Sequence, residues 1–328
     1  MEYVNCDLCD SETYEPVAHQ TDLLHRTTEQ VFTVVRCLQC GLQFTNPRPS
    51  TEEISKFYAS DYSFHADSPG WRRLADRYLD KLANGNFSFL GSLWPSLARR
   101  LAARVKPALK DPVLSFYEKG GQGTFLDIGC GAGFHSHFWG GSSALQVCRN
   151  RYDVAGVEVS PSARLALSRT GIRSWPDILS VPLQEKFGLI RMNWSLEHVH
   201  SPSEYFRFMA QHLSAEGQAV ITVPNYDGLI YRLAPDCIEL PIHLYHFRPA
   251  DILAYADRYG LTVIEIKTFS YPEMYRAAGN AGLLPKVFAD SWTVAQAKVI
   301  SEFLKSFDDL GWGNDMLIVL QKIPIGDE

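Results

Sequence analysis

The sequence has no long apolar run and no excess of basic residues. Nowhere do about 18 apolar residues stand together, the length that a membrane-spanning helix needs. Its 31 Lys and Arg residues are outnumbered by 37 Asp and Glu residues, and the formal net charge is −6 at pH 7. A chain with this balance has no general attraction for phosphate backbones, which argues against a nucleic-acid partner and favours a small-molecule substrate. We also find no internal repeat.

The N-terminus has neither the basic start nor the apolar segment of a signal peptide, so we expect a cytoplasmic protein. The length of 328 residues and the 46% of hydrophobic residues suit one large domain with a smaller appendage. The oligomeric state stays open, with a homodimer as one option. Seven cysteines are an odd number, and a reducing compartment favours thiols over disulfides.

Four of the cysteines form two close pairs, Cys6 with Cys9 and Cys37 with Cys40. Two knuckles of this kind can present four thiolates to one ion, which indicates a tetrahedral zinc site. Because four sulfurs leave no position for water, we expect this zinc to be structural. Redox-active or metal-free thiols remain the alternative. His19 and His25 lie between the pairs; surface positions are favoured for both, with a substitute-ligand role as the alternative.

The chain divides into three parts on this basis. Residues 1–48 are predicted to form a zinc-ribbon-like module, and the prolines at 47 and 49 mark its end. Residues 49–120 are predicted to be a helical connector or cap, with a first helix from Ser50 or Thr51 to Tyr58 and an amphipathic helix at 93–109. Residues 121–328 then form the main domain.

A glycine-rich turn opens the main domain. The apolar strand at 124–128 runs into Gly129, Gly131 and Gly133. Glycines allow a sharp strand-to-helix turn and remove the Cβ atoms that would block a ligand lying across it. A dinucleotide-binding G-x-G-x-x-G is excluded because Phe134 stands at its last position.

Strands and helices alternate after this turn. A strand at 153–158 ends in Glu158, where a carboxylate can accept both hydroxyls of a ribose. The order indicates a doubly wound α/β fold with a mostly parallel seven-stranded sheet, whose ligands lie at the carboxyl ends of the strands. The further predicted strands are 172–175, 189–192, 218–223, 261–266 and 316–320, and a helix is predicted at 251–259.

The ordered motifs resemble those of class I S-adenosylmethionine-dependent methyltransferases. They are Leu126–Gly133, the acidic Glu158, the segment Ser195–Val199, and Glu216 with Gly217 before the fifth strand. The segment from Cys37 to Pro49 is similar to the zinc-binding front of a subgroup that methylates nucleotide sugars and natural products. The resemblance covers most of residues 1–270 and leaves the acceptor unspecified.

The resemblance implies which residues hold the cofactor. The turn residues Gly129, Cys130, Gly131 and Gly133 would pass beside the methionine moiety and Asp127 would support the turn; Glu158 would hold the ribose, Asp177 the adenine amine, and Asn193 would lie near the sulfonium. The chain departs from the family where Gly188 replaces the usual Asp. It also carries an insertion at 270–312, which suggests an acceptor lid.

The best candidate for a general base is His198, with Glu197 to orient it, since imidazole titrates near neutral pH. This Glu-His pair resembles the catalytic site of related sugar C-methyltransferases. A role in shaping the site is the alternative. His243 and His246 follow the fifth strand, where acceptor residues project, although packed or surface positions are equally consistent with the sequence. Tyr58 and Tyr62 are candidates for closing over the cofactor or acceptor, and ordinary interdomain packing is equally consistent with the sequence.

Three functions are therefore compared. The first is methyl transfer to a hydroxyl or carbon of a sugar, nucleotide sugar or other natural product. The second is an RNA methyltransferase whose zinc module grips RNA, although residues 1–48 contain only Arg26, Arg36 and Arg48 as basic residues. The third is a non-catalytic zinc-ribbon interaction protein that keeps the fold as a scaffold.

Overall fold

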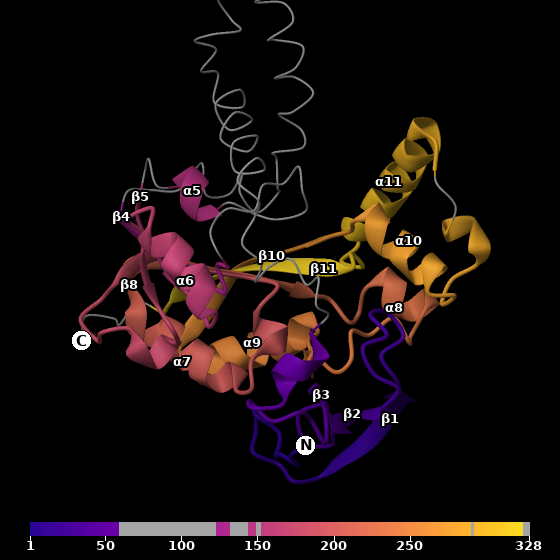
Figure 1. Cartoon of the computed structure of the whole chain (residues 1–328), viewed down its shortest axis with the longest axis horizontal. Helices are drawn as coiled ribbons and strands as arrows, with labels where there is room; N and C mark the ends of the chain where they lie inside the picture. Colours follow the sequence, from indigo (N-terminus) through magenta and orange to yellow (C-terminus); the bar gives the residue numbers. More distant parts are fainter. Residues whose placement is uncertain (59–122, 132–143, 149–151, 290–291, 324–328) are drawn as a thin grey trace, which may run out of the picture. The chain divides into compact units, whose positions relative to one another are not determined.

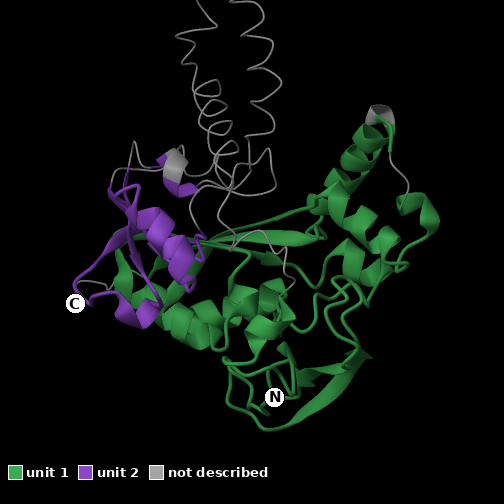
Figure 2. Ribbon diagram, in the orientation of Figure 1, with its two compact units in different colours: residues 1–60, 192–328 green, residues 61–191 purple. Residues whose placement is uncertain are grey.

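The computed structural model describes residues 1–58, 123–131, 144–148, 152–289 and 292–323 (Figure 1). The chain divides into two compact units, Met1–Ser60 with Met192–Glu328 and Asp61–Arg191 (Figure 2). The predicted amphipathic helix at 93–109 and most of the connector at 49–120 lie outside the described residues. Among the described residues, no helix has the length and apolar character that crossing a membrane requires.

The unit Asp61–Arg191 contains three parallel strands. Strand β4 (Gly123–Ile128) pairs with β5 (Tyr152–Val157), which pairs with β6 (Arg173–Trp175). Helix α5 (Ala144–Cys148) precedes β5, and α6 (Pro161–Ser168) follows it. Helix α6 begins as its sequence dictates, because the Ser160 hydroxyl accepts from the Ala163 amide and Pro161 needs no donor partner at the first position.

Seven strands form one mostly parallel sheet with flanking helices, which confirms the predicted α/β class. Their order is β10-β11-β8-β7-β4-β5-β6. Strand β7 (Phe187–Asn193) is followed by β8 (Leu213–Pro224), β10 (Leu261–Phe269) and β11 (Asp315–Lys322). The late β11 pairs antiparallel with both β8 and β10. Every strand predicted in the main domain is present, and helix α9 (Pro249–Arg258) matches the prediction within two residues.

The N-terminal residues form a second, four-stranded antiparallel sheet. Its strands are β1 (Tyr14–Gln20), β2 (Phe32–Cys37), β3 (Gln43–Thr45) and β9 (Tyr245–His246). The last strand comes from far along the chain, and its Tyr245 packs its ring against Phe44 of β3. The helix predicted from residue 50 to Tyr58 is wrong in type: only the short 3-10 helix η1 (Ile54–Phe57) forms there. Glu53 caps the preceding turn at the Ser50 amide, so the capping signal was real but no α-helix follows it.

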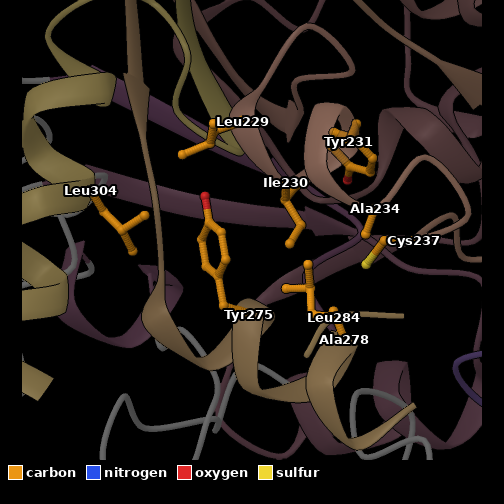
Figure 3. Packing of buried hydrophobic residues seen from close by; sticks show 9 residues of the cluster. All are labelled: Leu229, Ile230, Tyr231, Ala234, Cys237, Tyr275, Ala278, Leu284 and Leu304. Atoms are coloured by element: carbon orange, nitrogen blue, oxygen red, sulfur yellow. The ribbon is translucent and has the colours of Figure 1, made fainter. Parts of the chain in front are cut away.

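The insertion at 270–312 is helical and has its own core. It contains α10 (Pro272–Asn280), η6 (Lys286–Phe288) and α11 (Val294–Asp308), which pack with α8 (Leu229–Leu233). Figure 3 shows Tyr275 between Leu304 of α11 and Ile230 of α8. The Tyr275 hydroxyl donates to Asn314 Oδ1 at the start of β11, so the insertion is tied to the segment after β8 and to the last strand.

The contact between the glycine turn and β5 depends on Gly156. A Cβ atom added there would lie 2.5 Å from Cys130 Sγ, and the Cys130 side chain is buried. Protein interiors are packed too closely for such an atom to be absorbed without displacement. The thiol of Cys130 therefore fills the space that glycine leaves in the neighbouring strand.

We expect Gly156→Ala to lower the free energy of unfolding by about 1–3 kcal/mol, because the added methyl group overpacks this contact. Urea denaturation measures the change. The double variant Cys130→Ala with Gly156→Ala should recover part of the loss, since the smaller residue at 130 makes room. If the free energy of unfolding lost by the double variant equals the sum of the losses of the two single variants, the contact between residues 130 and 156 is contradicted.

Candidate active site

The turn after β4 has the backbone conformation that only glycine adopts readily. Gly129 has φ of 74° and Gly131 has φ of 57°. The Gly129 amide donates to the Val157 carbonyl at 2.8 Å, which fixes the turn against the end of β5. The predicted need for glycine at these two positions is therefore confirmed. Gly133 lies outside the described residues.

Glu158 holds this turn from the next strand. Its side chain is buried, its Oε2 accepts from the Gly131 amide at 2.8 Å, and its Oε1 accepts from the Ser160 amide at 2.8 Å. The carboxylate is thus fixed at the carboxyl end of β5 by backbone donors. An ionised carboxylate offers about four lone-pair positions, so ribose hydroxyls still find acceptors there.

Asp127 supports the turn through a buried ion pair. Both of its carboxylate oxygens accept from Arg191 Nη1, at 3.1 and 3.0 Å, and both side chains are almost fully buried. Burial raises the pKa of Asp127, and the Arg191 charge opposes that rise. Sequence reasoning missed Arg191. An arginine inside the apolar strand β7 was the signal that a buried anion needed a partner.

Two further predicted cofactor residues make local contacts. The Cys130 thiol turns inward toward Gly156, which leaves only its backbone to line the turn. Asp177 caps the 3-10 helix η4 (Ile178–Ser180) by accepting from the Ser180 amide through Oδ1 at 2.7 Å. The Asp177 cap fixes the orientation of this carboxylate after β6.

Asn193 ends strand β7 in the other unit. Its Oδ1 atom is buried and has no hydrogen-bond partner among the described residues. A buried carbonyl oxygen without a donor is costly, by about 1–3 kcal/mol. The Oδ1 atom of Asn193 is therefore an unused hydrogen-bond acceptor at the end of β7.

His198 lies in the 3-10 helix η5 (Leu196–His198) and is held by a carbonyl. Its Nδ1 donates to the Ile242 carbonyl at 2.9 Å, and the Tyr58 hydroxyl lies 3.4 Å from the same nitrogen. Since a carbonyl only accepts, the ring proton is on Nδ1 and the lone pair is on Nε2. Tyr58, a candidate for closing over the cofactor or acceptor, therefore lies beside His198; Tyr62 lies outside the described residues.

Glu197 is fully buried beside His198 but does not orient it by a hydrogen bond. Its Oε1 lies 3.9 Å from His198 Nε2, and neither carboxylate oxygen has a hydrogen-bond partner among the described residues. The predicted orienting role passes to the Ile242 carbonyl at the opposite ring nitrogen. Burial raises the pKa of Glu197 well above its usual range.

His243 stands edge-on to His198, with ring centres 4.7 Å apart. Its Nδ1 is 3.4 Å from the Tyr226 hydroxyl, and its Nε2 is 3.9 Å from Glu239 Oε2. Burial lowers the pKa of His243, although Glu239 opposes the change. The structure therefore brings together two of the predicted histidines.

Sequence reasoning missed Glu239, which joins this cluster from the loop before His243. Its Oε2 lies 2.9 Å from Nε2 of His25. Burial raises the pKa of Glu239, but His243 and His25 outweigh that effect and lower it to about 2. His25 therefore pairs with Glu239 and is absent from the cysteine cluster. No local pattern in the sequence connects positions 25 and 239.

His246 belongs to the N-terminal sheet. Its Nε2 is 3.2 Å from the Thr45 hydroxyl across the β3–β9 pair, and its side chain is fully buried. Burial lowers the pKa of His246 to about 3, so the ring is neutral. Of the two histidines predicted in this loop, His243 lies at the His198 cluster and His246 is a packing residue.

The four cysteines meet as the spacing predicts. Cys6 Sγ lies 3.4 Å from Cys40 Sγ, and Cys9 Sγ lies 3.5 Å from Cys37 Sγ. All four sulfur atoms lie within 4.8 Å of one another, and none is in a disulfide. Tetrahedral Zn–S bonds of about 2.3 Å separate neighbouring sulfurs by about 3.8 Å, so the arrangement fits a zinc ion after a small expansion. His19 binds Thr33 instead and takes no part in the cluster.

Comparison with solved structures finds methyltransferases. An S-adenosylmethionine-dependent methyltransferase from Mesorhizobium loti is 17% identical over 64% of this chain and 96% of its own, with a TM-score of 0.42. One from Clostridium acetobutylicum is 11% identical over 77% and 99%, with a TM-score of 0.42. An O-methyltransferase of a trans-AT PKS multienzyme from Brevibacillus brevis, in complex with S-adenosyl-L-homocysteine, is 14% identical over 75% and 80%, with a TM-score of 0.42. No curated protein matches the chain.

A family model described as a methyltransferase domain matches residues 93–266. The match spans more than half of the 328 residues and includes the glycine turn, Glu158 and His198. The chain therefore belongs to the methyltransferase domain family.

Proposed function

We propose that the enzyme methylates a small-molecule acceptor, a hydroxyl or acidic carbon of a sugar, nucleotide sugar or other natural product, with His198 as general base. The observation that carries the proposal is the hydrogen bond from His198 Nδ1 to the Ile242 carbonyl. It leaves the lone pair on Nε2, the state that a base needs in order to take a proton from an acceptor. An acceptor that carries no proton would not call for such a residue.

The residues of the glycine turn fit the methyl donor. Gly129 and Gly131 offer a backbone without side-chain obstruction, and Glu158 is anchored so that it can accept the ribose hydroxyls. Asp177 has a second oxygen for the adenine amine, and the buried Oδ1 of Asn193 can accept a donor near the sulfonium. When bound, S-adenosylmethionine supplies a methyl group on a positively charged sulfur.

The protein contributes positioning and one proton transfer. Methyl transfer is an in-line displacement, so holding the acceptor close and aligned supplies several kcal/mol of the rate enhancement. His198 Nε2 would remove the acceptor proton, and the Ile242 carbonyl would stabilise the imidazolium through Nδ1. Glu197 Oε1 lies 3.9 Å from His198 Nε2, and the His243 ring stands edge-on to the His198 ring. We propose that the insertion at 270–312 covers the acceptor.

We further propose that Cys6, Cys9, Cys37 and Cys40 hold a structural zinc ion in the module of residues 1–48. Support comes from the way both knuckles are attached. The Arg258 guanidinium donates to the Leu8 carbonyl in the first knuckle, and Arg248 donates to the Gly41 carbonyl beside the second. Zinc would therefore stabilise the surface on which α9 packs.

Replacing the proposed base tests the mechanism. We expect His198→Ala to lower kcat by about 10²–10⁴-fold, because the acceptor proton loses its base. Transfer of a labelled methyl group to a panel of sugars, nucleotide sugars and natural products measures turnover. Isothermal titration should show unchanged affinity for S-adenosylmethionine. His19→Gln, on an exposed strand, is the matched control and should keep wild-type turnover. Unchanged turnover of His198→Ala would end the general-base proposal.

Metal analysis tests the cysteine site. We expect Cys37→Ser to lose one equivalent of zinc per chain, measured by plasma mass spectrometry, and to lower Tm, because binding free energy of a structural zinc is folding free energy. Cys237→Ala is the control: this buried cysteine lies outside the cluster, so its variant should keep the zinc even if packing suffers. The assignment would be refuted if the purified wild-type protein contained no zinc and the Tm of Cys37→Ser equalled the wild-type Tm.

A further inference from the structure

We infer that Glu197, His198 and His243 form a second metal site, which binds a divalent transition cation such as Zn²⁺ and thereby inhibits the enzyme. The inhibitory part rests on the proposed function, since a metal on His198 Nε2 occupies the lone pair that the base needs. The site is separate from the four cysteines and differs from them in ligand chemistry.

The first support is convergence of three ligands of the right type. One ligand atom from each residue lies within 4.8 Å of the other two, and His198 Nε2 is 3.9 Å from Glu197 Oε1. Ligands at about 2.0–2.2 Å in a tetrahedral zinc site are about 3.3 Å apart. Small side-chain rotations would close the difference. Two imidazoles and one carboxylate leave a fourth position open, as in catalytic zinc sites.

The second support is the state of Glu197. Its side chain is fully buried, and both carboxylate oxygens have no hydrogen-bond partner among the described residues. A buried carboxylate is retained in proteins when a donor or a metal compensates its desolvation. The backbone brings Glu197 to the histidine loop, because the Leu244 amide donates to the Glu197 carbonyl at 2.8 Å. A cation between the carboxylate and the two rings supplies the missing partner.

The third support is the set of groups behind the ligands. Metal-binding histidines donate their other ring N–H to a carbonyl or a carboxylate, which fixes the tautomer. His198 has this arrangement with the Ile242 carbonyl, and His243 Nδ1 has the Tyr226 hydroxyl at 3.4 Å. Glu239, 3.9 Å from His243 Nε2, adds negative charge beside the site. The Ile242 contact places the His198 lone pair on Nε2, where a cation would bind, and the Tyr226 contact holds the His243 ring in place.

Cobalt substitution tests the site on the full chain with its cysteine cluster loaded with zinc. Titration with Co²⁺ should show one further equivalent with ligand-field bands and no thiolate charge-transfer band, since the ligands are nitrogen and oxygen. Glu197→Gln, which keeps the shape of the side chain, should weaken this binding at least 10-fold. His243→Gln should do the same, and Glu12→Gln, at an exposed position after the first knuckle, should bind as wild type. Circular dichroism checks that each variant is folded.

Activity distinguishes the two proposals. Added Zn²⁺ should inhibit methyl transfer by wild type at least 10-fold, and a chelator too weak to strip the cysteine site should restore it. Absence of the further equivalent, or its survival in Glu197→Gln, overturns the metal site and leaves the general-base proposal standing. Metal-dependent stimulation of turnover would instead overturn both inhibition and the base.

Discussion

The structure depends on how each buried carboxylate is compensated, because removing a charge from water is costly unless donors or a cation replace the water. Glu158 is compensated by the amides of Gly131 and Ser160, and this fixes the glycine turn to the next strand. Asp127 is compensated by Arg191, which locks the strand before the turn to β7. These two contacts fix the backbone path of the glycine turn.

A third carboxylate attaches the N-terminal module. Asp7, inside the first cysteine knuckle, accepts from the Ser201 hydroxyl, the Ser203 amide and the Tyr255 hydroxyl. It thereby supplies the Ser203 amide, at the start of helix α7 (Pro202–His212), with the acceptor that the N-cap side chain does not give. The segment from η5 to α7, which contains His198, is thus fixed at one end by the module. Disrupting the cysteine cluster would therefore disturb this segment as well as the fold of the module.

Much of the fold could be predicted because its signals are local. Apolar strands, glycines at positive φ and the spacing of the cysteine pairs each depend on a few consecutive residues, and the structure has all of them. What could not be predicted is non-local pairing. Strand β9 joins the N-terminal sheet across about 200 residues of chain, His25 meets Glu239, and Arg191 meets Asp127. The site residues were identified by type, but their partners come from loops whose approach no periodicity encodes.

At residues 50–58 a capping signal was taken for a full helix, because capping determines where a helix begins and not how far it continues.

Glu197, in the histidine cluster, differs from these carboxylates in how its charge is compensated. Every other buried carboxylate described above is satisfied by donors that stabilise the fold, whereas both Glu197 oxygens lack a partner among the described residues. Two neighbouring imidazoles, of which His198 has a defined tautomer, and one unsatisfied carboxylate form a polar group that packing alone does not require. Such a group persists where it acts on a ligand, and the candidates for that ligand are a protonated acceptor and a cation. Both need the Nε2 lone pair of His198, so they compete, and the cluster cannot serve both at once.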